Sequence, residues 1–104
     1  MHEMSLLRGL LTQIEATARR HGAKRVSVVR LKLGPLAHIE PDHLREHFTV
    51  ATRGTIADSA RLEIQTTEEL HELSLESIDV EVSETTDSRR ALQHGPNEAR
   101  RIGE

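Results

Sequence analysis

The spacing of apolar residues switches from helical to alternating early in the chain, which restricts the fold to one that mixes helices with strands. In residues 4–21 apolar side chains recur at helical spacing, and Gly22 stands where a helix-ending glycine belongs. Residues 26–33 alternate instead and predict a strand. Ser27, Val29, Leu31 and Leu33 would share one face of that strand. Because the chain has no cysteine and one aromatic residue, Phe48, its core must be largely aliphatic and free of disulfides.

The pattern after Gly34-Pro35 predicts one more helix and two more strands. Glu40-Pro41 opens the helix, because proline suits the first helical position. Its buried stripe would be Leu44, Phe48 and Ala51, and Gly54 would close it. Residues 61–65 predict a short strand and residues 73–82 a longer one. A bulge near Glu76-Ser77 would bring both apolar sets of the longer strand onto the core side.

These elements predict an α+β domain over residues 1–82, with two helices packed on a small three-stranded β-sheet. Residues 83–104 have little apolar content and predict a disordered C-terminal tail, with room for a short helix around 88–93. From Thr55 to His94 there is no glycine, proline or asparagine to form a tight turn. The last two strands could therefore be joined by a wider turn at 66–69 as a hairpin. Alternatively, the last strand could cross to a second protomer in a strand-swapped homodimer.

Charge is distributed unevenly along the chain. Residues 1–35 carry seven Lys/Arg and two Asp/Glu, whereas residues 36–84 carry three and twelve. The acidic middle argues against nucleic-acid binding, which favours a basic face and stacking aromatics. The apolar start, interrupted by Arg8, fits neither a signal peptide nor a membrane span, and we expect a cytoplasmic protein without a membrane partner. The asymmetry suits either solvated faces or a docking surface of complementary charge.

The first residues, Met1-His2-Glu3, have the composition of a metal chelate. One short segment offers the terminal amine of Met1, the backbone nitrogen of His2 and its imidazole, in a planar set that Ni(II) or Cu(II) favours. A fourth ligand could be the amide of Glu3 or a carboxylate from elsewhere in the chain. An indifferent chain end would explain the same residues.

Five segments occur in unbroken order over residues 1 to about 82. They are MHEMSL with its helix, HGAKRVSVVRLKLG, the Glu-Pro helix start, RGTIADSARLEI and ELSLESIDVEV. In this order the chain resembles the HypA/HybF family of hydrogenase nickel-incorporation proteins. The resemblance implies a metallochaperone that delivers Ni(II) during maturation of [NiFe] hydrogenase, and in some organisms of urease. It implies that His2 is the essential nickel ligand, that Glu3 contributes through its backbone amide or its neighbourhood, and that Glu40 is an acidic residue near the site. The implied partners are the nickel-handling GTPase HypB and the hydrogenase large subunit, with the basic first helix (Arg8, Arg19, Arg20) as a candidate contact.

The chain departs from the family at one point. Family members carry a zinc module with two Cys-x-x-Cys pairs between the second and last strands, whereas here Gln65 is followed by Thr66-Thr67-Glu68-Glu69 and the final strand. No zinc is therefore expected. A relative without zinc could also be a metal-free interaction or regulatory module of the maturation machinery.

The sequence gives weaker support for metal binding by the other histidines. His43 and His47 lie four residues apart, so both could face one ion, although this spacing also occurs on solvated helix faces. His38 could assist at the nickel site or be a loop residue, and His21 suits a helix C-terminus. The chain shows no catalytic triad context and no phosphate-binding glycine loop, so we expect it not to be an enzyme.

Overall fold

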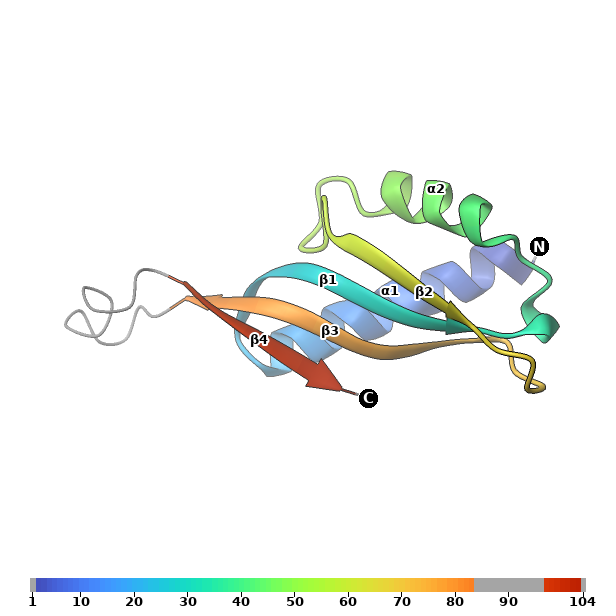
Figure 1. Ribbon diagram of the computed structural model, residues 1–104. Helices are drawn as coiled ribbons and strands as arrows, with labels where there is room; N and C mark the ends of the chain where they lie inside the picture. Colours follow the sequence, from blue (N-terminus) through green and yellow to red (C-terminus); the bar gives the residue numbers. More distant parts are fainter. Residues whose placement is uncertain (1, 84–96, 104) are drawn as a thin grey trace.

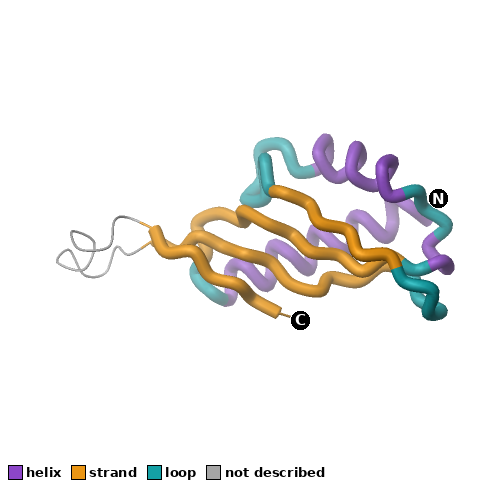
Figure 2. Tube along the Cα trace, in the orientation of Figure 1, coloured by secondary structure: helices purple, strands orange, loops and turns teal. Residues whose placement is uncertain are grey.

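The computed structural model describes residues 2–83 and 97–103 (Figure 1). The elements follow one another as α1 (His2–Arg20), β1 (Ala23–Leu33), the 3-10 helix η1 (Pro35–Ala37), α2 (Pro41–Ala51), β2 (Arg61–Thr66), β3 (Leu73–Ser83) and β4 (Asn97–Gly103). Figure 2 shows the strands forming one continuous sheet, and α1 runs behind it in Figure 1. No helix in the described residues is long and apolar enough to span a membrane.

The sheet has four strands in the order β2-β1-β3-β4, so the expected three-stranded sheet was wrong in its strand number. The additional strand, β4, lies in the segment expected to be a disordered tail and pairs antiparallel with β3. It places Ile102 opposite Ile78, and Ile102 is only 8% exposed. Because β4 has a single large apolar residue, its sequence gives no periodic signal. The short helix considered at 88–93 lies outside the described residues.

The predicted hairpin between the second and third strands was also wrong. β2 pairs parallel with β1, and β3 pairs antiparallel with β1 on the other side. A parallel pair needs a crossover connection, which α2 supplies between β1 and β2. In this structure β3 pairs with β1 of the same chain, and the strand-swapped homodimer stays a prediction.

The connection from β2 to β3 passes over the end of β1 and is bound to it by backbone hydrogen bonds. Thr67 N donates to the Leu33 carbonyl at 2.9 Å, and Gly34 N donates to the Glu72 carbonyl at 2.8 Å. Leu36 N donates to the His71 carbonyl at 3.0 Å. These bonds satisfy backbone groups that a tight turn would have paired locally.

The bulge predicted in the strand at residues 73–82, which is β3 in the structure, was confirmed. Arg30 pairs with Ser77, but the next residue, Leu31, pairs with Leu75, so Glu76 is the extra residue. The bulge lets residues of both parities reach the core, where Leu75, Ile78 and Val80 are buried. A second irregularity, around Ser27 in β1, puts Val26 rather than Ser27 in the core. The Ser27 hydroxyl instead donates to the Asp79 carbonyl at 3.2 Å.

Both predicted helices were confirmed and contribute to one core. α1 buries Leu7, Leu10, Ile14 and Ala18, and Gly22 follows it at φ +66°. In α2, Leu44 and Phe48 are fully buried, and Ala51 packs partly buried against them. Pro41 stands in the first turn of α2, and the Thr52 backbone N–H donates to the Phe48 carbonyl at its end. The core thereby fixes the direction in which each helix presents its remaining faces.

Candidate functional site

The predicted nickel-binding segment lies at the start of α1. The backbone of His2 and Glu3 forms the first residues of this helix, whereas Met1 and the side chains of His2 and Glu3 lie outside the described residues. The first four N–H groups of an α-helix have no intrahelical acceptor. The backbone nitrogens of His2 and Glu3 are therefore not committed to helical hydrogen bonds.

Glu40, the predicted acidic neighbour, is the residue that precedes α2. Its backbone is extended, with φ −75° and ψ 134°, and its exposed carboxylate makes no capping hydrogen bond. Figure 1 shows the start of α1 and the start of α2 at the same end of the molecule. Among the described side chains, no three or more His, Asp or Glu groups come together as a metal site. The geometry leaves Glu40 accessible without joining it to other described ligands.

The remaining single histidines differ in their surroundings. His38 is an exposed loop residue at φ 54° and ψ 43°, and its backbone N–H closes η1 by donating to the Pro35 carbonyl. His21 is exposed beyond the end of α1. His71 is half-buried in the β2–β3 connection, where its Nε2 lies 2.9 Å from Ser74 Oγ. None of the three lies within a described cluster of metal ligands.

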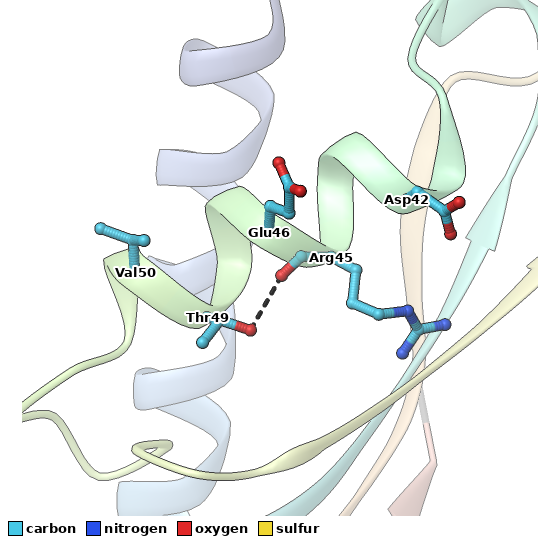
Figure 3. Close-up of a pocket in the computed structure, with 5 residues that line it drawn as sticks. All are labelled: Asp42, Arg45, Glu46, Thr49 and Val50. Atoms are coloured by element: carbon cyan, nitrogen blue, oxygen red, sulfur yellow. Dashed lines mark hydrogen bonds between the residues drawn. The ribbon is translucent and has the colours of Figure 1, made fainter.

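A hollow of about 680 Å³ lies beside α2 (Figure 3). It is lined by Asp42, Arg45, Glu46, Thr49 and Val50. Figure 3 shows Arg45 extending from the helix toward the sheet, where its guanidinium donates to the Leu62 carbonyl of β2. Thr49 Oγ1 donates to the Arg45 carbonyl at 2.9 Å. The lining mixes both signs of charge with one apolar side chain, and it offers no convergent set of ligands.

A charged network crosses the sheet, and the sequence analysis did not find it. Arg30 makes a bidentate pair with Asp79 at 2.8 and 3.1 Å, and its Nε donates to Glu63 at 3.0 Å. Arg30 Nη1 also lies 3.3 Å from Ser77 Oγ, and Arg101 Nε lies 3.5 Å from Asp79. The network therefore joins all four strands through their side chains. Opposite charges at alternate strand positions were the only signal for it in the sequence.

The hydrogen bonds from the Arg30 guanidinium hold the pKa of Asp79 below its ordinary value of 3.8, and Asp79 in turn raises the pKa of Arg30. A carboxyl whose pKa is lowered by folding stabilises the fold above its unfolded pKa, and this contribution is lost as pH falls through the folded pKa. We expect Asp79→Asn to lower the free energy of unfolding by about 1–3 kcal/mol at pH 7. The difference in the free energy of unfolding between this variant and the parent protein, measured by urea unfolding, should shrink below about pH 4.

Glu81→Gln is the matched control on the same strand. Glu81 pairs with Arg25 at 3.3 Å, but the Arg25 side chain is 47% exposed, and such pairs contribute little. Its change should stay within about 0.5 kcal/mol at both pH values. An equal effect of the two substitutions would contradict a special role for the Arg30–Asp79 pair.

Comparisons with known proteins agree with the resemblance in the sequence. Residues 1–72 match the family model described as "Hydrogenase/urease nickel incorporation, metallochaperone, hypA". Hydrogenase maturation factor HypA of Methylocella silvestris is 47% identical over 64 residues, which cover 62% of this chain and 57% of the relative. The protein of the same name from Alkalilimnicola ehrlichii is 52% identical over 64 residues, with the same coverage. The chain thus spans little more than half the length of these relatives.

The solution structure of the Ni metallochaperone HypA from Helicobacter pylori has a similar fold. The TM-score is 0.56 at 20% sequence identity, over 64% of this chain and 58% of that one. The family model matches residues from the start of the chain, including His2, to the end of the β2–β3 connection. The family comprises metallochaperones rather than enzymes, and the absence of cysteine excludes a cysteine-ligated zinc site from this chain. The chain belongs to the HypA family of hydrogenase/urease nickel-incorporation metallochaperones.

Proposed function

We propose that this chain carries Ni(II) for the maturation of [NiFe] hydrogenase and binds the ion through Met1, His2 and Glu3. The observation that carries the proposal is the family match over residues 1–72, which includes His2 and Glu3 at the start of α1. Loss of the His2 amide proton creates a negative nitrogen at the positive end of the helix dipole, which favours it. Ni(II) then receives the amine, the amide nitrogen and the imidazole in one plane.

Two further features support this assignment. Glu40 is exposed and makes no capping bond, so its carboxylate can serve as a ligand or as a nearby negative charge. Such an open site suits a carrier, because a receiving protein can approach the ion and exchange ligands with it. Nickel binding should weaken as pH falls through about 6.5, because a free imidazole takes up a proton there.

The proposed partners are the GTPase HypB and the hydrogenase large subunit. Arg8, Arg19 and Arg20 are exposed on α1, so this helix offers a basic surface to an acidic partner. We expect a cytoplasmic protein that acts without nucleic acid or membrane, as a monomer or as a homodimer.

The proposal predicts that His2→Ala lowers Ni(II) affinity at least about 100-fold, since the variant loses the imidazole that completes the chelate. The untagged protein should be titrated with Ni(II) by calorimetry, and the d–d absorbance of planar, low-spin Ni(II) should be recorded in parallel. The parent protein should bind one equivalent with this absorbance, and His2→Ala should show none of it.

His21→Ala is the matched control, because it removes an exposed histidine beyond the other end of the same helix. Its low-spin absorbance and affinity should match those of the parent protein. Binding that survives His2→Ala would contradict the proposed site. Hydrogenase maturation that proceeds normally with His2→Ala would instead favour the alternative, a metal-free interaction module of the maturation machinery.

A further inference from the structure

Two histidines lie next to one another on α2, a different helix from the one that carries the proposed nickel segment. The ring centroids of His43 and His47 lie 4.7 Å apart, and their planes are inclined by 35°. His43 is exposed and His47 is half-buried. Both rings are therefore within reach of solvent, and the i, i+4 spacing puts them on one side of the helix.

This separation is compatible with two imidazoles that bind a single metal ion. A metal–nitrogen distance of about 2.0–2.1 Å places the ion about 3.2 Å from each ring centroid. Two rings that subtend about 90–110° at the ion then have centroids about 4.5–5.2 Å apart. The observed 4.7 Å lies within this interval.

The helix beneath the two rings is held rigidly. Leu44 follows His43 and Phe48 follows His47, and both apolar side chains are fully buried in the core. Arg45 ties the middle of α2 to the Leu62 carbonyl of β2. Because the helix is already fixed by these contacts, binding a metal would require little ordering of the backbone.

The chemistry around the pair favours a cation. The segment reads His43-Leu44-Arg45-Glu46-His47, the histidine spacing that zinc enzymes use on a helix. Asp42 and Glu46 are exposed acids that neighbour the two histidines in sequence, and Glu40 precedes the helix three residues before His43. The one basic residue of α2, Arg45, has its guanidinium directed to Leu62.

We propose that His43 and His47 form a second metal-binding site for a divalent transition metal that prefers imidazole, such as Zn(II). The site is independent of His2 and of the proposed nickel-carrying function. Two protein ligands leave the other coordination positions to water, so the bound ion is exchangeable and open to a ligand from another protein.

Zn(II) is the probe that separates this site from the planar chelate at the N-terminus, because it has no electronic preference for planar geometry. Zinc affinity should be measured by competition with a chromophoric chelator at pH 7.5. We expect His43→Gln and His47→Gln each to lower the affinity at least 10-fold, since either change destroys the chelate. The zinc affinity of the double variant should lie within about twofold of that of the weaker-binding single variant.

His21→Gln removes an exposed imidazole elsewhere and should leave the affinity within about twofold, as should His2→Ala. Zinc should also raise the melting temperature of the parent protein and of these two controls, but not of the double variant. Melting without zinc verifies that every variant is folded. Unchanged affinity in either single α2 variant, or an equal loss in His21→Gln, would overturn the proposal. Loss in His2→Ala alone would assign the zinc to the N-terminus and overturn it as well.

Discussion

Phe48→Ala is expected to lower the free energy of unfolding by about 3–5 kcal/mol. Phe48 is the single aromatic residue of the chain and, among the residues that the structure describes, the largest fully buried side chain, at 1% exposure. Its removal leaves a cavity in a core otherwise made largely of aliphatic side chains, and these cannot close it without moving α2. Equilibrium unfolding in urea, followed by circular dichroism, measures the difference.

Val50→Ala, two residues further along α2, is the control. Val50 is 58% exposed, and its truncation should change stability by no more than about 0.5 kcal/mol. Since α2 carries His43 and His47, Phe48→Ala should also weaken zinc binding, whereas Val50→Ala should not. Equal stability of the two variants would show that α2 does not depend on Phe48 for its attachment to the core.

The helices and the bulge could be predicted because their signals are local. The 3.6-residue period in residues 4–21 and the Glu40-Pro41 start mark α1 and α2 without any knowledge of their neighbours. The change of parity in β3 indicates the extra residue at Glu76 for the same reason, since only a bulge puts both parities on one face.

Strand order could not be predicted, because alternation indicates which face of a strand is buried but not which strand lies beside it. The short segment between β2 and β3 favoured a hairpin, yet both strands pair with β1. β4 was missed because Ile102 is the single large apolar residue in its sequence, which leaves no apolar alternation to recognise.

The residues of the candidate site likewise include some that the sequence could indicate and some that it could not. His2, Glu3 and Glu40 came from the family resemblance, and their roles at nickel stay predictions. The Arg30 network was missed because its acidic partners lie far away in sequence, with Glu63 33 residues and Asp79 49 residues from Arg30. Only the observed strand order brings them to one guanidinium.

Gly34→Ala is expected to lower the free energy of unfolding by about 3 kcal/mol, at the upper end of the range for overpacking. A Cβ atom on Gly34 would lie 2.3 Å from the His71 carbonyl oxygen and 2.6 Å from the His71 Cβ. One of these contacts is to backbone, so no side-chain rotation relieves it. The β2–β3 connection would have to move away, and its hydrogen bond from Gly34 N to Glu72 would be lost. Urea unfolding measures the cost.

Gly9→Ala is the matched control, and its expected effect has the opposite sign. Gly9 lies inside α1 with nothing within 4 Å of an added Cβ, so alanine should stabilise the helix by about 0.5–1 kcal/mol. Amide hydrogen exchange separates the mechanisms further, since Gly34→Ala should raise exchange at the amides of Leu36 and Thr67, which bond across the connection, while Gly9→Ala should not. If both alanines stabilised the protein, the connection could not lie against the end of β1 as the structure has it.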